Sequence, residues 1–338
     1  MLEKIREAAE HIKAMEKAMQ EKASQLRNSG HVFTEALEKN LVIPVKEISV
    51  NGKIASVDGG LLAQEMHGAD VVIARAAAAV FEYKNSRLVS HEYFPNAFPE
   101  PDYDIKIGLD EREIMSFRSL FRLRKEIECA ISVLESRKPT YLMMDGSLLP
   151  LTADKPLEES DVFYEYQKVV GLYKKLYSSA NGNGCRLLGV IKDSRSKRFT
   201  DISRSVVDVH SSDTFFLNHL LKSGERTFSF KYTSDVKKHP ITRDFGADAA
   251  GINAMYVKPV KEDVPLRVEF INQEYDEIAS LVYSLSKINK NYAYPAILIE
   301  ADLRAALDPI ELERAMKSLA MHTGMRIAPL RRNSRPFR

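Results

Sequence analysis

The spacing of apolar residues predicts several helices along the chain. Residues 2–27 repeat apolar side chains at helical intervals with charged residues between them, as amphipathic helices do. The same spacing predicts further helices over residues 110–137, 158–180 and 273–290, and a last helical pattern that runs to about His322. The apolar stripe of the first helix must be covered, either by its own domain or by a partner protein.

Shorter apolar and β-branched runs predict the strands. The first three form an antiparallel meander, with a turn at Lys84-Asn85-Ser86: residues 54–58, 69–83 and 87–94. The proline-rich stretch from Pro95 to Asp104 is predicted to be a loop. Two later strands, residues 141–145 and 186–192, alternate with helices, and short crossovers of this kind make strands parallel. Two more strands follow at residues 252–260 and 265–271. The pattern as a whole indicates an α/β fold.

Composition and charge narrow the class of protein. The chain has 338 residues, 44% of them hydrophobic and 28% charged, as in ordinary soluble globular proteins. Its formal net charge is only +2, so any basic surface that binds nucleic acid must be local. Bulk charge therefore neither demands nor excludes a nucleic-acid partner.

Cysteine content and hydropathy indicate a cytoplasmic protein. Cys129 and Cys185 are the only cysteines, too few for a disulfide framework and without metal-ligand spacing, which predicts a reduced setting. The N-terminus lacks the unbroken apolar core of a signal peptide. The longest apolar run, Val71 to Phe81, is interrupted by Arg75 and is too short to span a bilayer, so no membrane role is expected.

Two strands carry an aspartate followed by glycine. Asp58 follows the apolar run from Ile54 and precedes two glycines, and Asp145 follows the run from Tyr141 in the same way. Each stretch taken alone is also typical of a turn. If the two strands are neighbours, their carboxylates lie side by side and repel each other unless a cation lies between them. The pair therefore favours a metal site.

Three further carboxylates join this candidate set. Glu126 lies beside the apolar stripe of its helix, where it needs either a metal or an ion pair with Arg122. Asp302 falls near the predicted start of the last helix, where it is a ligand or a partner of the helix dipole, and Asp193 follows a strand. A site made of oxygen ligands alone suits Mg²⁺ or Mn²⁺.

Residues 195–251 mix basic and aromatic side chains. Cations for phosphates and rings for bases are typical of nucleic-acid surfaces. An insertion with its own small core gives the same composition. The sequence leaves both readings open.

The order of these features is that of ribonuclease-H-like folds, and in detail the chain resembles the NurA nuclease family. That family works with the HerA translocase in DNA-end processing in archaea and some bacteria. The matching motifs are spread over residues 54–302: Ser56-Val-Asp58-Gly-Gly, the Glu126 helix, Met144-Asp145-Gly-Ser-Leu, Val190-Ile-Lys192-Asp-Ser, Tyr256-Val-Lys258, and Tyr294-Pro295 with Glu300-Ala-Asp302.

The resemblance implies an architecture. It predicts a ribonuclease-H-like mixed sheet with helices on both faces and helical N- and C-terminal arms. Residues 1–45 then form the N-terminal arm, residues 46–323 the nuclease domain with 195–251 as an insertion, and residues 324–338 a basic tail. The active form is expected to be a homodimer that partners a HerA-type hexameric ATPase.

The resemblance also implies an activity: Mn²⁺-dependent, or Mg²⁺-dependent, 5′→3′ exonuclease and single-strand endonuclease cleavage of DNA by a two-metal mechanism, in recombinational repair. Asp58, Glu126, Asp145 and Asp302 carry over as metal ligands, although Asp302 stands where some family members have histidine. Lys192 and Tyr256 carry over as residues that contact the scissile phosphate or orient the water. A strand-end lysine and a core tyrosine are the plain alternatives for these two.

Two other functions compete with the nuclease. A non-catalytic DNA-binding adaptor of the translocase would keep the fold, but it would be expected to have lost at least one of the four acidic positions. Actin-like ATPases also place Asp-Gly turns after strands, but they need two such cores, and only one is found here.

Overall fold

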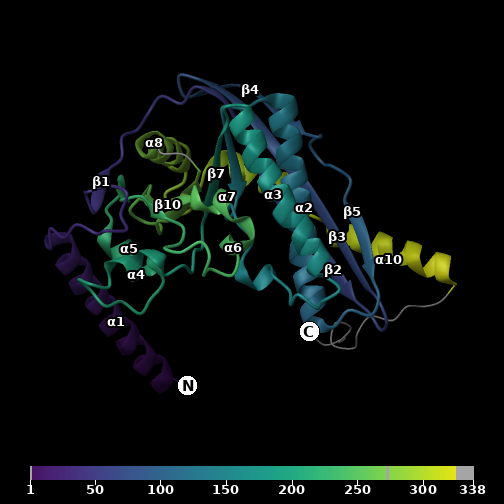
Figure 1. The fold of residues 1–338 in the computed structure, drawn as a ribbon, viewed down its shortest axis with the longest axis horizontal. Coiled ribbons are helices and arrows are strands. Elements are labelled where there is room, and N and C mark those ends of the chain that lie inside the picture. The colour runs from purple at the N-terminus through teal and green to yellow at the C-terminus, as the bar shows by residue number, and fades with distance from the viewer. Residues whose placement is uncertain (1, 272–273, 325–338) are drawn as a thin grey trace. The chain divides into compact units, whose positions relative to one another are not determined.

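The computed structural model describes residues 2–271 and 274–324, and the chain divides into two compact units. Unit 1 holds residues 1–50, 188–239 and 246–296, and unit 2 holds residues 51–187, 240–245 and 297–338. Each unit is built from segments far apart in the sequence, and each combines helices with part of a sheet (Figure 1). The predicted mixed α/β class is confirmed, and so are the helical segments near both ends.

Unit 2 contains the predicted meander. Its strands run in the order β6, β2, β3 and β4, and β5 also pairs with β3: β2 Gly52–Glu65, β3 Asp70–Lys84, β4 Arg87–Phe94, β5 Asp102–Lys106 and β6 Tyr141–Asp145. The β5 strand lies partly in the stretch that the sequence predicts to be a loop, and that prediction was wrong there. The β2–β6 pair is parallel, whereas the others are antiparallel.

Two long helices pack in unit 2. They run beside each other, and α2 also contacts β2 and β3 (Figure 1): α2 Glu111–Arg137 and α3 Phe163–Gly182. Asp110 caps α2, since its carboxylate accepts hydrogen bonds from the N–H groups of Arg112 and Glu113. Short helical turns complete this part of the chain: η1 Thr152–Asp154 and α6 Thr242–Phe245.

The end of the described chain forms two helices rather than one: α9 Ala296–Ala305 and α10 Pro309–Thr323. Asp302 therefore lies in the second half of α9. The sequence pattern predicts it near the start of a helix, and that prediction was wrong. The break falls at Leu307-Asp308-Pro309, because proline begins helices readily and cannot continue them, and Asp308 caps α10. The predicted basic tail lies outside the described residues from 325 onward.

Unit 1 has its own run of strands, in the order β1, β8, β10, β11 and β7, with β9 pairing with β10: β1 Val42–Pro44, β7 Arg186–Ile191, β8 Glu225–Thr227, β9 Phe230–Lys231, β10 Asn253–Lys258 and β11 Leu266–Phe270. The pairings of these strands with one another are antiparallel. Its helices are α1 Leu2–Asn28, α4 Arg198–Ser203, α5 Asp213–Leu220, α7 Ala247–Ala250 and α8 Tyr275–Ser286.

Most of segment 195–251 belongs to unit 1, and four of its rings form core there. These rings are buried against one another and against α1: Phe199, Phe216, Phe228 and Phe230. Rings in that position cannot stack on bases, so these four residues do not supply the aromatic surface that the nucleic-acid reading requires.

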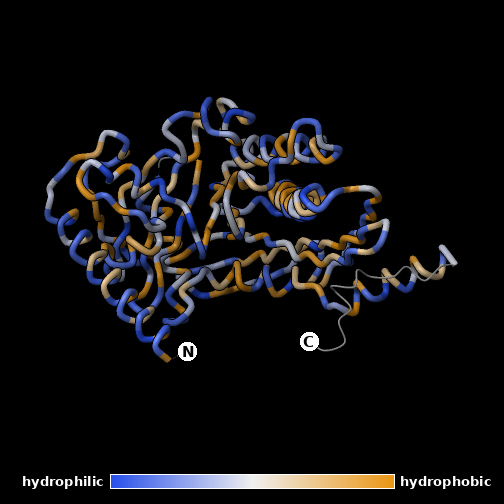
Figure 2. Tube along the Cα trace, turned by 90° about the horizontal axis from the view of Figure 1, so that it is seen from below, coloured by the Kyte–Doolittle hydropathy of each residue, from blue (hydrophilic) through white to orange (hydrophobic). Residues whose placement is uncertain are grey.

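Helix α1 is covered over half of its length. Met19, Ala23 and Leu26 are buried in the unit 1 core, whereas its first half leaves apolar side chains exposed: Leu2, Ile5, Ile12 and Met15. Hydrophobic and hydrophilic residues alternate along both α1 and α10 (Figure 2). Among the described residues, no helix is long and apolar enough to cross a membrane.

Candidate functional site

Asp58 and Asp145 lie on neighbouring parallel strands. The register pairs Ile54 with Tyr141 and Val57 with Met144, so the next residue of each strand is one of the two aspartates. Asp58 is only 7% exposed, and its carboxylate accepts a hydrogen bond from the N–H of Gly59 at 2.7 Å. The expectation that two Asp-Gly motifs bring carboxylates side by side is met in the structure.

The two glycines after Asp58 serve close packing, not a turn. Strand β2 continues through them to Glu65, so the predicted turn at Asp58 was wrong. A Cβ atom on Gly59 would lie 2.6 Å from Cγ of Glu126, and one on Gly60 would lie 2.2 Å from the carbonyl oxygen of Ala305. Glycine therefore lets α2 and α9 approach β2 next to Asp58.

Glu126 is buried and ion-paired. Its carboxylate lies 2.5 Å from Nη1 of Arg122, one helical turn earlier, which is the ion pair that the sequence offers as the alternative to a metal. Burial raises the pKa of Glu126 to about 7; Arg122 opposes that shift, while the charges of Asp145 and Asp154 add to it. The single arginine does not offset the acidic groups around it.

Asp58 experiences the same crowding. Burial, then the charges of Asp145 and Glu126, raise the pKa of Asp58 to about 8, and a hydrogen bond with Asp302 acts in the same direction. Asp302 is itself exposed on α9. The four carboxylates predicted as ligands thus interact within unit 2.

Asp154 is a fifth carboxylate that the sequence analysis missed. It is 6% exposed, accepts a hydrogen bond from the Ser119 hydroxyl at 2.6 Å and caps the short η1 turn. Its charge acts on both Glu126 and Arg122. An aspartate in the loop Leu151-Thr152-Ala153-Asp154 has no strand or helical period to mark it, so the sequence carries no signal for it.

The donor set fits a hard divalent cation, although the side chains do not enclose one as they stand. Within residues 2–271 and 274–324, no group of three or more His, Cys, Asp or Glu side chains is arranged to hold a metal ion. Glu126 points to Arg122, and Asp58 is hydrogen-bonded to Asp302. The candidate ligands are nevertheless all oxygen donors, burial and neighbouring carboxylates raise the pKa of Asp58 and of Glu126, and a cation relieves such repulsion.

Lys192 and Tyr256, also predicted as site residues, belong to unit 1. Lys192 follows β7 and lines a cavity of about 130 Å³ with Asp193 and Asp263, and its Nζ lies 5.0 Å from the Tyr294 ring centroid. Tyr256, on β10, is fully buried, and burial raises the pKa of its hydroxyl to about 12. Asp193 is exposed beside Lys192.

Comparisons with known proteins agree on the family. The NurA domain model matches residues 52–307. The crystal structure of the NurA nuclease from Sulfolobus solfataricus is 16% identical, covers 96% of each chain and has a TM-score of 0.61. A second NurA crystal structure is 12% identical, covers 94% of this chain and 98% of its own, and has a TM-score of 0.53. No curated protein sequence matches. At these identities the likeness to the solved structures shows the shared fold.

Proposed function

Because the chain belongs to the NurA family, we propose that it is a metal-dependent nuclease that cleaves phosphodiester bonds in DNA. The observation that carries the proposal is the burial of the Asp58 carboxylate and the crowding of Asp145, Glu126 and Asp302 around it, which together raise its pKa to about 8. A protein that needed these groups only for folding would gain stability by losing some of the charge. A divalent cation that binds among them would offset their repulsion.

The residues divide between holding the metal and holding the substrate. Asp58, Glu126, Asp145 and Asp302 hold Mn²⁺ or Mg²⁺, and Arg122 restrains the Glu126 carboxylate. When bound, two such ions supply a reactive water and stabilise the oxygen that leaves the phosphate. Lys192 supplies a cation for the phosphate backbone, as its place after β7 allows.

We further propose the assembly that the family resemblance implies. The protein forms a homodimer and works with a HerA-type hexameric translocase in DNA end resection, with 5′→3′ exonuclease and single-strand endonuclease activity. We assign the contact with the translocase to the exposed apolar half of α1, which carries Leu2, Ile5 and Ile12. Unchanged co-purification with the translocase after deletion of residues 1–27 would remove that assignment.

Cleavage of DNA by the Asp58→Ala variant tests the proposal. We expect end-labelled single- and double-stranded DNA to be cut by the wild type with Mn²⁺ or Mg²⁺ but not with EDTA. Loss of a metal ligand removes several kcal/mol of transition-state stabilisation, so the variant is expected to be slower by about 10³-fold or more. Asp161→Ala, which removes an exposed carboxylate of the same unit, is the matched control and keeps full activity.

Each outcome of that assay has a meaning. Near-normal cleavage by a folded Asp58→Ala protein would overturn the mechanism. Tight DNA binding without cleavage under any divalent ion would support the adaptor alternative instead. Turnover of ATP by the purified chain alone would support the actin-like alternative.

A further inference from the structure

The loop after β7 carries exposed positive charge in addition to Lys192, which the proposed function already uses. Residues 192–198 read Lys-Asp-Ser-Arg-Ser-Lys-Arg, which is four basic residues and one acidic residue. Arg195 and Lys197 are exposed, and in the described part of the chain neither makes an ion pair. Arg198 differs from them, because it pairs with Glu35 at 2.5 Å and donates to the Lys231 carbonyl. Arg195 and Lys197 are thus available for an anionic partner.

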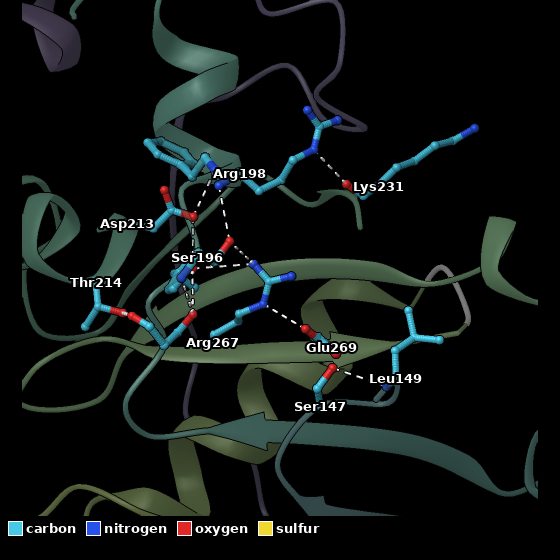
Figure 3. Close-up of polar contacts among 12 residues, drawn as sticks. Ser147, Leu149, Ser196, Arg198, Asp213, Thr214, Lys231, Arg267 and Glu269 are labelled. Atoms are coloured by element: carbon cyan, nitrogen blue, oxygen red, sulfur yellow. Dashed lines mark hydrogen bonds and ion pairs between the residues drawn. The ribbon is translucent and has the colours of Figure 1, made fainter. Parts of the chain in front are cut away.

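Arg267 lies buried beneath this loop and ties it to the sheet. Its side chain on β11 is 5% exposed, and its Nε donates to Glu269 at 2.8 Å. Its Nη1 donates to the Ser196 hydroxyl at 3.0 Å, and Ser196 stands between the two exposed cations (Figure 3). The Ser196 hydroxyl in turn accepts a hydrogen bond from the Arg198 N–H. The middle of the loop is therefore fixed from below.

Asp213 fixes the point where the loop enters α4. Its carboxylate accepts hydrogen bonds from the N–H groups of Phe199 at 3.0 Å and Thr200 at 2.9 Å, and from the Thr200 hydroxyl. It is fully buried on α5 (Figure 3). A buried carboxylate satisfied by several donors holds those donors firmly in place.

Tyr256 joins these two anchors. Its hydroxyl donates to Asp213 at 3.0 Å, lies 3.5 Å from Nη1 of Arg267, and lies 3.4 Å from the hydroxyl of Ser194 in the loop. Because the ring is completely buried, the hydroxyl has no open face toward a substrate. A direct contact with a phosphate, as the family resemblance implies for this residue, does not fit this position.

We propose that loop 192–198 binds the phosphates of single-stranded DNA through Arg195 and Lys197, and that Tyr256, Asp213 and Arg267 position it. The proposal rests on the proposed nuclease function for the identity of the anion. A loop held in its binding conformation loses little conformational entropy when DNA binds, so preorganisation raises affinity. Tyr256 is then a positioning residue that acts through the loop.

Binding of a 5′-fluorescein-labelled single-stranded oligonucleotide, followed by anisotropy in EDTA across a range of NaCl concentrations, tests the loop. Two lost phosphate contacts lower the slope of log affinity against log salt by about 1.4 for a single strand. We expect this change for the double variant Arg195→Ala, Lys197→Ala. The control Lys4→Ala, Lys17→Ala removes two exposed lysines of α1 in the same unit and keeps the wild-type slope.

A double-mutant cycle tests the positioning role. Tyr256→Phe keeps the ring and removes the hydroxyl, and we expect DNA affinity to fall several-fold with little change in melting temperature. If Tyr256 acts through the loop, adding Tyr256→Phe to the Arg195→Ala, Lys197→Ala variant weakens binding no further. A variant with only a general structural defect would show additive losses. If Tyr256→Phe does not fold, Ser196→Ala replaces it in the cycle. This variant removes the hydroxyl that accepts the hydrogen bond from Arg267 and leaves the buried core unchanged.

The results separate this inference from the proposed function. A loop variant with the wild-type salt slope, or strictly additive losses in the cycle, would overturn the inference even if the wild type cleaves DNA. Absence of cleavage by the wild type under every divalent ion would overturn the proposed nuclease instead, whatever the salt slope.

Discussion

Two of the buried clusters of ionisable side chains, one around Asp58 and one around Arg267, differ in their balance of charge. Around Asp58 in unit 2, several carboxylates act on one another, and the pKa values of Asp58 and Glu126 rise to about 8 and about 7 although Arg122 pairs with Glu126. Around Arg267 in unit 1, each charge meets a partner of opposite sign or several hydrogen-bond donors, as for Glu269 and Asp213. Acidic groups outweigh the basic one in the first cluster, whereas the charges of the second are matched.

This difference distinguishes a ligand-binding site from a network that only holds the structure in place. A fully satisfied buried network rigidifies its surroundings and holds them in one conformation. An incomplete one destabilises the fold, because burial and like charges both disfavour the ionised carboxylates. Proteins keep such strain where function requires it. We therefore assign ligand chemistry to the Asp58 cluster and positioning to the Arg267 network.

The largest stability effect in these clusters is expected from Arg267→Met. The substitution leaves Glu269 buried without its cation, and breaking a buried pair costs about 3–5 kcal/mol of unfolding free energy. Urea unfolding measures it. The control Arg204→Met breaks an exposed pair with Asp201 and is expected to cost about 0.5 kcal/mol or less. Equal losses for the two variants would show that the network is not the support described here.

A smaller loss is expected from Gly60→Ala. Its new methyl group would meet the Ala305 carbonyl oxygen, and backbone cannot move aside as a side chain can, so overpacking is expected to cost about 1–3 kcal/mol. Gly171→Ala, in the interior of α3 with open space around it, is the control and is expected to stabilise the protein by about 0.5–1 kcal/mol. Thermal or urea unfolding distinguishes the two signs.

The smallest effect is expected at Glu225, which pairs with Arg27 nearer the surface. Burial acts to raise its pKa, but hydrogen bonds from Arg27 and from the Lys222 N–H prevail and lower it below the ordinary value. The pair therefore stabilises the fold above the ordinary glutamate pKa, and the benefit is lost as the pH falls through the lowered one. Glu225→Gln is expected to cost about 0.5–1 kcal/mol at pH 7.

Unfolding of the wild type and Glu225→Gln at a series of pH values from 7 to about 3 checks this, because the two stabilities should converge only below the ordinary glutamate pKa. A difference that stayed constant over that range would contradict the linkage.

Much of the fold was readable from the sequence, because it rests on periodicity. The helix of Glu126, the three-stranded meander and the strand of Asp145 all appear where the pattern predicts them. Local turn chemistry was less reliable: Asp58-Gly59-Gly60 looks like a turn but stays in a strand, since its glycines serve contacts with distant helices. Such contacts leave no local pattern.

The site was readable only in part for the same reason. Asp58 and Asp145 follow from strand register, but Asp154 is brought to the cluster by a loop. Basic and aromatic residues in segment 195–251 look alike in sequence whether rings are buried or exposed. The structure is needed to show that Phe199 and its neighbours are buried in the core, whereas Arg195 and Lys197 are exposed on the surface.

The most direct test of the metal site is the melting temperature of the wild type and Asp58→Asn, each with EDTA and with increasing Mn²⁺. In EDTA, Asp58→Asn is expected to melt higher, because it removes one of the repelling carboxylates. Mn²⁺ is expected to raise the melting temperature of the wild type by mass action and that of the variant much less. An equal response of both proteins to Mn²⁺, with no gain for the variant in EDTA, would contradict the assignment of this cluster as a metal site.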